Sequence, residues 1–221
     1  MNVWTWWVED SLFPLPTLKG FSVVPSLDCA LVARLCETDE TTVSQRFASA
    51  HRCYVAWVGT VPAAYGWVAR AQAQVGELAL TFAVSADERY LWDFATLPAW
   101  RGRGLYPRLL RSILLQERAM RFWIIHAPEN RASARGIQKA SFQPAGLLSF
   151  VAEGDAALVS GRQLARARAA GRLLRVPLMA QRHARRLNPC WTCFTTRRCA
   201  TGALRLCDQS CHCAPPAQGV Q

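Results

Sequence analysis

Residues 97–106 have the sequence LPAWRGRGLY and join an apolar segment, residues 90–97, to an amphipathic segment, residues 107–120. The apolar segment predicts a buried strand, and the leucine and isoleucine spacing in the second segment predicts a helix. Free N–H groups at the start of a helix attract anions, and glycines let a phosphate approach the backbone closely. Gly102, Gly104 and the neighbouring arginines therefore predict a phosphate or pyrophosphate site at this turn.

A basic surface turn that needs two glycines for its backbone is the alternative interpretation of this loop. The loop is not a P-loop, because no Gly-Lys followed by Ser or Thr is present. It is not a dinucleotide fingerprint either, because the pattern G-x-G-x-x-G is absent. The choice between a phosphate site and a plain surface turn stays open at this point.

Hydrophobic periodicity predicts a mixed α/β fold around the loop. The expected strands are residues 21–24, 53–58, 61–69, 77–84, 90–97, 121–126 and 142–151. Helices are expected after Asp28 and Asp39, over residues 107–120 and over residues 130–140. The strand at 90–97 is apolar on both faces, which predicts a sheet that helices cover on both sides.

Charge divides the chain into a nearly neutral part and a basic part. Of the 221 residues, the first 159 carry 15 Lys and Arg against 14 Asp and Glu, whereas residues 160–221 carry 11 Arg and one acid. We therefore expect an aromatic arm over residues 1–20, one domain over residues 21–159 and a basic, Cys-rich extension over residues 160–221. No apolar run is long enough to span a membrane and no secretory signal begins the chain, so a cytoplasmic location is expected.

The extension has two chemical features with open interpretations. Its arginines could bind nucleic acid, a membrane surface or another acidic partner, or could form a solvated helix packed on the domain. Cys190 and Cys193 have the spacing of half a zinc site, and Cys199 and Cys207 are the candidates to complete it. Thiols without a metal-binding role are the alternative, because the second half matches no regular zinc pattern.

Two blocks of the sequence resemble the GNAT superfamily of acyl-CoA N-acyltransferases. Residues 101–106, RGRGLY, are similar to its R-x-x-G-x-[GA] acyl-CoA loop, with Tyr106 in place of the final small residue. Residues 130–142 look like its N-x-x-[SA]-x(5)-K-x-G-F segment, with Ser141 in place of glycine. The resemblance covers residues 21–151. It implies a GNAT-like mixed sheet with flanking helices and a V-shaped opening between two central parallel strands.

The resemblance implies that acetyl-CoA lies in this opening, between residues 90–97 and 121–126, and that a substrate amine attacks the thioester directly. The residues that it places against acetyl-CoA are Phe94, Ala95, Thr96, Arg101, Gly102, Arg103, Gly104, Leu105, Tyr106, Asn130 and Ser133. The strand residues would contact the pantetheine arm, the loop residues the pyrophosphate, and Asn130 the side of the pantetheine.

The residues that would transfer protons match the pattern of this family less well than the loop does. A tyrosine often serves as leaving-group acid in this family, but Ile137 occupies that position here. Tyr106 or another group serves instead, the thiolate leaves unaided, or the chain binds acetyl-CoA without turnover. The candidate bases are Asp93, Glu77 and His126. The alternative for Asp93 is a carboxylate that caps a neighbouring loop or pairs with an arginine. The alternative for Glu77 is an exposed acid at a strand end, and that for His126 is a hydrogen-bonded histidine at the rim.

Overall fold

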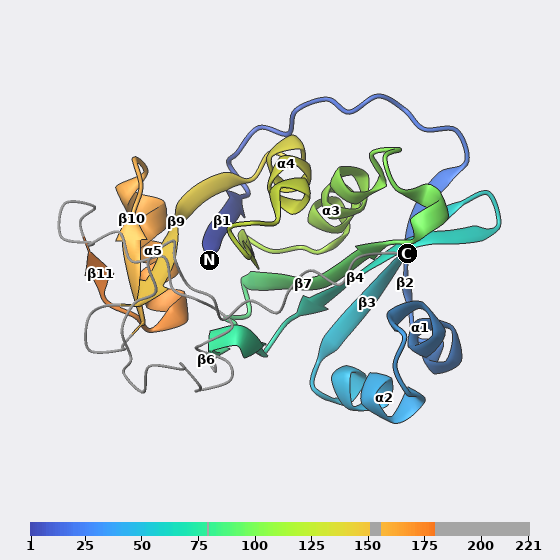
Figure 1. Ribbon diagram of the computed structural model, residues 1–221, viewed down its shortest axis with the longest axis horizontal. Helices are drawn as coiled ribbons and strands as arrows, with labels where there is room; N and C mark the ends of the chain where they lie inside the picture. Colours follow the sequence, from blue (N-terminus) through green and yellow to red (C-terminus); the bar gives the residue numbers. More distant parts are fainter. Residues whose placement is uncertain (79, 151–155, 180–221) are drawn as a thin grey trace, which may run out of the picture. The chain divides into compact units, whose positions relative to one another are not determined.

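The computed structural model describes residues 1–78, 80–150 and 156–179, which form two compact units. The first unit comprises Met1–Ala73 and Ala83–Pro144, and the second comprises Gln74–Phe82 and the chain from Ala145 onward. The two units are described separately below, with element labels as in Figure 1. None of the described helices has the length and apolar character needed to cross a membrane.

A twisted mixed sheet forms the centre of the first unit, and its strands lie in the order β1, β8, β7, β4, β3, β2 (Figure 1). Their bounds are β1 Asn2–Trp7, β2 Phe21–Ser26, β3 His51–Val58, β4 Val61–Ala69, β7 Glu88–Thr96 and β8 Arg121–His126. β7 and β8 run parallel, whereas the other neighbouring pairs are antiparallel. A parallel pair needs a crossover connection, and a helix supplies it here.

Helices cover both faces of this sheet (Figure 1), which confirms the prediction from the apolar strand at residues 90–97. The helices are α1 Cys29–Cys36, α2 Glu40–Ala48, α3 Leu105–Gln116 and α4 Arg131–Lys139. Alternate side chains of β3 separate the two cores: Tyr54 packs with α3 and α4, whereas Cys53 and Val55 pack with α1 and α2. The fold class predicted from the sequence is thereby confirmed for the first unit.

Local sequence signals explain where the helices begin. The carboxylate of Asp28 accepts a hydrogen bond from the Leu31 N–H, and that of Asp39 accepts one from the Thr42 N–H. Each satisfies an N–H group that has no partner inside the helix. In α3 the predicted apolar stripe is fully buried, and each such side chain contributes about 1.5–3 kcal/mol. The stripe consists of Leu109, Leu110, Ile113 and Leu114.

A buried carboxylate fixes the C-terminal end of α3. Glu117 accepts hydrogen bonds from Arg89 at 2.7 Å, from Arg52 at 3.1 Å and from the Tyr54 hydroxyl at 3.0 Å. Burial acts to raise the pKa of Glu117, but the hydrogen bonds from Arg89 and Tyr54 and the nearby arginine charges lower it overall. Glu117 therefore anchors the C-terminal end of α3 to the strands. The glycine loop lies at the opposite, N-terminal end of this helix.

The second unit contains short strands and one helix. Its elements are η1 Gly76–Leu78, β6 Leu80–Ala83, β10 Ala156–Ser160, α5 Leu164–Leu174 and β11 Leu178–Met179, together with parts of β5 Gln72–Val75 and β9 Gln143–Phe150. β5 pairs with β6, β10 pairs antiparallel with β9, and β11 pairs parallel with β10. Small and apolar side chains of α5 are buried, including Ala167, Ala170 and Leu174.

Three segments differ from the sequence-based expectation. Residues 2–7, expected to be part of an arm without periodicity, form β1 and pair with β8. Residues 77–84, expected to be one strand, contain a 3-10 helix followed by the shorter strand β6. The expected boundary at residue 159 falls inside β10, and the first part of the arginine-rich segment folds as α5 and β11. Here long-range pairing decides the structure and local composition does not.

Candidate functional site

The parallel strands β7 and β8 separate along their length. They pair from Glu88 with Arg121 up to Leu91 with Ile124, and β7 then continues to Thr96 without further pairing to β8. On its other side β7 stays paired with β4 as far as Thr96. One backbone edge of β7 is therefore open beyond Leu91, and an open strand edge can bind an extended, amide-containing chain.

A β-bulge lies at the start of this opening. Trp67 of β4 pairs with Trp92, and Tyr65 pairs with Ala95, so Asp93 and Phe94 together face the single residue Gly66. Asp93 has a left-handed φ of 49°, which an aspartate tolerates better than most residues. A Cβ atom on Gly66 would lie 2.0 Å from the Phe94 ring, so only glycine fits there.

The glycine loop follows directly after β7. The 3-10 helix η2, Pro98–Trp100, leads into Gly102 and Gly104, which have left-handed φ values of 77° and 68°. Glycine is the residue that best adopts this backbone conformation at both positions. The first N–H groups of any helix lack an intrahelical acceptor, and at α3 the N-cap residue Gly104 has no side chain to accept from them.

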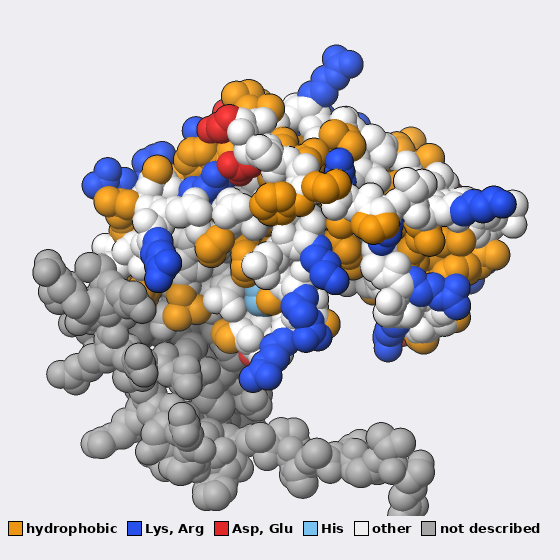
Figure 2. Space-filling model, turned by 90° about the horizontal axis from the view of Figure 1, so that it is seen from above, with side chains coloured by type: hydrophobic (Ala, Val, Ile, Leu, Met, Phe, Trp, Pro, Cys, Tyr) orange, Lys and Arg blue, Asp and Glu red, His pale blue; other side chains and the backbone are white. Residues whose placement is uncertain are grey.

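The charge around the loop is positive. Arg101 donates to the Thr96 carbonyl at 3.2 Å, and the Arg103 guanidinium lies 4.9 Å from the centre of the Trp100 ring. Lys and Arg side chains are spread over the face shown in Figure 2, where Asp and Glu side chains are few. A helix N-terminus and neighbouring arginines are features that favour the binding of phosphate groups.

These features belong together in one fold. A mixed sheet splays at its single parallel pair within the first unit, a bulge lies at the splay, and the strand ends in a glycine turn that opens a helix. The fold is GNAT-like. The V-shaped opening and the loop predicted for it lie in the positions that the sequence resemblance assigned to them.

Comparisons with known proteins give the following similarities. A GCN5-related N-acetyltransferase from Kribbella flavida is 14% identical, with a TM-score of 0.45 over 65% of this chain and 53% of that chain. The AAC(6')-Iy structure with the bisubstrate analog CoA-S-monomethyl-acetylneamine is 14% identical, with a TM-score of 0.45 over 59% of this chain and 96% of that chain. An aminoglycoside 6'-N-acetyltransferase from Acinetobacter haemolyticus is 18% identical, with a TM-score of 0.42 over 61% of this chain and 99% of that chain.

The aligned part spans 53% and 59% of the first two solved structures, which is less than two thirds of their length. Neither a family model nor a curated protein matches the sequence. The GNAT-like assignment rests on the strand order, the splayed parallel pair and the glycine loop of this chain.

Tyr106, one of the residues predicted to donate a proton, lies at the start of α3. It is the second residue of α3 rather than part of the preceding loop, and its hydroxyl lies 3.3 Å from the Ser133 hydroxyl of α4. Its ring packs against Gly136, where a Cβ atom would come within 2.3 Å of it. Burial raises the pKa of Tyr106 to about 12, so the phenol carries its proton at neutral pH.

His126 is held by hydrogen bonds at both ring nitrogens. The Trp4 indole N–H can only donate, so Nε2 of His126, 3.0 Å away, accepts. The ring proton is then on Nδ1, which donates to the Ala127 carbonyl at 2.7 Å. Burial lowers the pKa of His126, and the imidazole is neutral near pH 7. Its one lone pair is occupied by Trp4, which matches the alternative of a hydrogen-bonded histidine at the rim.

The two acidic candidates lie in different surroundings. Asp93 pairs with Arg46 of α2 at 2.7 Å, which is the arginine pairing considered as its alternative. Glu77 lies within the 3-10 helix η1 in the second unit and not at the start of a strand, which corrects the expectation for its position. Asp93 follows the last β7 residues that pair with β8 and so lies at the start of the opening.

The remaining motif residues lie on α4 and β7. Asn130 caps α4 by accepting a hydrogen bond from the Ser133 N–H at 2.9 Å, which leaves its amide nitrogen as a donor. Ile137 is completely buried in the core between α4 and the sheet. Phe94, Ala95 and Thr96 lie on the part of β7 that has no partner on the β8 side.

The sequence interpretation missed the residues that surround Asp93. Arg46 comes from α2, and Trp67 and Trp92 come from β4 and β7. The arginine lies 47 positions before its carboxylate partner, and no local pattern connects them. The one signal in the sequence was that Trp67 and Trp92 each lie in an apolar strand.

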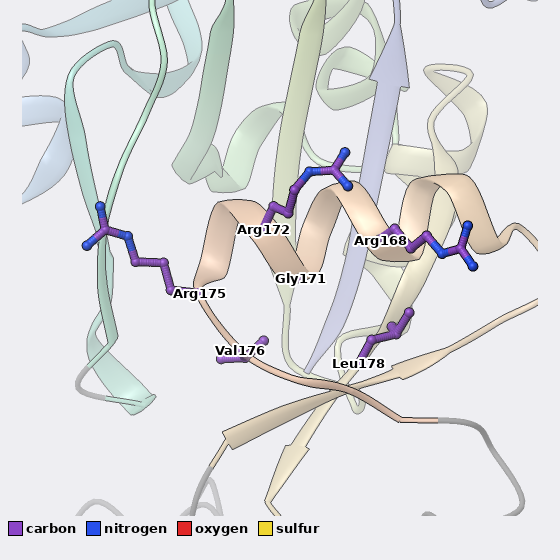
Figure 3. Close-up of a pocket in the computed structure, with 6 residues that line it drawn as sticks. All are labelled: Arg168, Gly171, Arg172, Arg175, Val176 and Leu178. Carbon is purple, nitrogen blue, oxygen red and sulfur yellow. The ribbon is translucent and has the colours of Figure 1, made fainter.

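Figure 3 shows a hollow in the second unit beside α5, with Arg168, Arg172 and Arg175 around it. The three guanidinium groups point in different directions and do not converge on one point. A phosphate or carboxylate would therefore meet single arginines here. Recruitment of an acidic partner, nucleic acid or membrane by the extension stays a prediction.

The zinc prediction concerns residues beyond the described ranges. Cys190, Cys193, Cys199 and Cys207 all lie outside them. Within residues 1–78, 80–150 and 156–179, no group of three His, Cys, Asp or Glu side chains could hold a metal ion.

Proposed function

We propose that the protein transfers an acetyl group from acetyl-CoA to an amine. The observation that carries this proposal is the open edge of β7 beyond Leu91, which leads without interruption into the Gly102–Gly104 turn and the start of α3. Pantetheine has amide groups that can pair with a strand edge, and pyrophosphate suits a helix N-terminus. A single ligand with both parts in that order is CoA.

The reaction fits the groups around the opening. The amine nitrogen attacks the thioester carbonyl, a C–N bond forms and the C–S bond breaks. The amine proton leaves to a base or to water, and the CoA thiolate takes up a proton. Asp93 is the described carboxylate at the opening, and the protonated phenol of Tyr106 is a donor for the thiolate.

A CoA-binding module without turnover is the second candidate function. Its supporting observation is Ile137, which is fully buried and offers no proton at the position where the family often has tyrosine. Ser141, at the usual glycine position, has a left-handed φ of 76° and accepts a hydrogen bond from the Phe13 N–H. A cytoplasmic location remains a prediction for either function.

Thermal unfolding with and without acetyl-CoA tests the proposal. Binding to the native state stabilises it by about RT ln(1 + [L]/Kd), which is about 2.7 kcal/mol at ~100 Kd. Gly102→Val should abolish the shift, because a branched side chain obstructs a phosphate at the loop backbone. Gly59→Val is the matched control, since both glycines have a left-handed φ and open space around them. No shift for the folded wild type would sink the proposal, and binding without thiol release with any amine would favour the second candidate.

A further inference from the structure

An ion pair over two tryptophan rings lies beside the opening between β7 and β8. Nη1 of Arg46 donates to Oδ2 of Asp93 at 2.7 Å. The same guanidinium lies 4.9 Å from the centre of the Trp67 ring and 4.6 Å from that of Trp92. Asp93 comes two residues after Leu91, the last β7 residue that pairs with β8. The pair therefore lies where β7 becomes free to bind a ligand.

The surrounding residues hold this arrangement in place. The Trp92 indole N–H donates to Nδ1 of His51 at 3.1 Å, and the Trp67 indole N–H donates to the Cys36 sulfur at 3.5 Å. The bulge gives Asp93 its left-handed backbone and thereby fixes the direction of its side chain. Both rings and the carboxylate are thus positioned before any ligand binds.

The pair has unused hydrogen-bonding capacity. A guanidinium has five N–H donors, and a carboxylate has acceptor sites on both oxygens. Among the described residues, the hydrogen bonds of Arg46 and Asp93 side chains use only Nη1 and Oδ2. The side chains are 23% and 32% exposed, so a ligand can reach both. Arg46 can therefore still bind a negative group, and Asp93 can still bind a positive group.

The charge balance selects the kind of ligand. A simple cation near Asp93 would also meet the Arg46 charge, and a simple anion near Arg46 would also meet Asp93. A zwitterion with its charges on neighbouring carbons avoids both repulsions, because it can lie antiparallel to the ion pair. Its carboxylate then faces the guanidinium and its ammonium faces the free carboxylate oxygen.

We propose that Arg46 and Asp93 bind the acceptor of the acetyl group, and that this acceptor is a free α-amino acid. This inference rests on the proposed function, since it supplies the amine for the thioester. The ammonium must lose a proton before its nitrogen can attack, and the free oxygen of Asp93 is the acceptor at hand. Arg46 is a binding residue that holds the carboxylate of the amino acid. The amino group of that ligand then points toward the opening.

The test measures binding and turnover separately. Isothermal titration of the CoA-saturated protein with the common L-amino acids gives affinities without any reaction. Thiol release from acetyl-CoA is then followed with the tightest amino acid, with its amide and with its decarboxylated amine. Arg46→Gln removes the guanidinium that would bind the carboxylate of the amino acid. Arg46→Lys restores the positive charge without the planar guanidinium. Arg34→Gln, on the exposed face of α1, is the control.

We expect the free amino acid to exceed its amide in kcat/KM by about 10-fold or more, as for one lost charge-assisted hydrogen bond. Arg46→Gln should bring this ratio close to one, Arg46→Lys should recover part of it, and Arg34→Gln should leave it unchanged. The affinity for acetyl-CoA should stay the same in all three variants.

Two results would overturn the inference while acetyl-CoA binding stands. One is that the wild type uses the amide or the amine with the same kcat/KM as the amino acid, and the other is that no amino acid binds. Loss of acetyl-CoA binding in the wild type would instead remove the proposed function, and this inference with it.

Discussion

The indole N–H of Trp4 on β1 donates to Nε2 of His126 on β8, at 3.0 Å. The two residues are 122 positions apart in the sequence, and their rings are stacked with centroids 6.2 Å apart. β1 brings them together because Trp4 pairs with Ile124 on the neighbouring strand. This contact fixes the tautomer of His126 and predicts how the stability of the protein depends on pH.

Stability should fall in mild acid because of His126. Burial lowers the pKa of His126 below its usual 6.5 in the folded chain, so the unfolded chain takes up a proton first as the pH drops. The contribution of neutral His126 to the free energy of unfolding is complete above about pH 6.5. It declines below that pH until His126 is protonated in the folded chain as well. Urea unfolding at about pH 7.5 and about pH 5 measures the change. His126→Gln, which can keep both hydrogen bonds, should show a smaller loss than the wild type. An identical loss in the variant would show that His126 has no part in it.

Gly66→Ala should destabilise the bulge. A Cβ atom there would lie 2.0 Å from the Phe94 ring, and relief requires movement of Phe94 or of the strand. Overpacking of this kind costs about 1–3 kcal/mol, and the displaced β7 should also bind acetyl-CoA more weakly. Denaturant unfolding and calorimetric titration measure both effects. Gly76→Ala is the control, because a Cβ atom there meets nothing within 4 Å. Equal stability of the two variants would contradict the packing described for Phe94.

Tyr106→Phe should lower kcat without changing the affinity for acetyl-CoA. The pKa of about 12 keeps the phenol protonated, so it can donate to the departing thiolate. Loss of a general acid typically lowers the rate by about 10²-fold or more. Ser133→Ala, which removes the hydroxyl partner at 3.3 Å but keeps the phenol, should lower kcat less than Tyr106→Phe. Unchanged kcat in the phenylalanine variant would show that the thiolate leaves without this donor.

A chain ending at Val159 should lose the cooperative folding of the second unit. Without α5 and β11 it lacks the side chains that bury Leu158, and it ends inside β10. A chain ending at Met179 keeps every described residue and should retain this transition. Circular dichroism during thermal unfolding distinguishes the two chains. Both should bind acetyl-CoA, since the strands and loop that form the candidate site belong to the first unit. A single, identical transition in both chains would place the boundary at residue 159 after all.

The sequence predicted features that depend on neighbouring residues. Asp28 and Asp39 start helices because their carboxylates cap N–H groups a few residues away. The apolar face of α3 and the turn at Gly102 and Gly104 likewise follow from local spacing and from the conformations that glycine permits. These local signals, together with the strand periodicity, sufficed for the mixed α/β fold class and for the position of the glycine loop.

Contacts between distant segments were decided only by the tertiary structure. β1 joins the sheet although its sequence has no clear alternation, because pairing with β8 buries Val3 and Trp6. Arg46 reaches Asp93 only after α2 packs on the sheet and the bulge turns the carboxylate toward it. Such contacts join segments from separate parts of the chain, and their free energy comes from burial and charge pairing that no local pattern encodes.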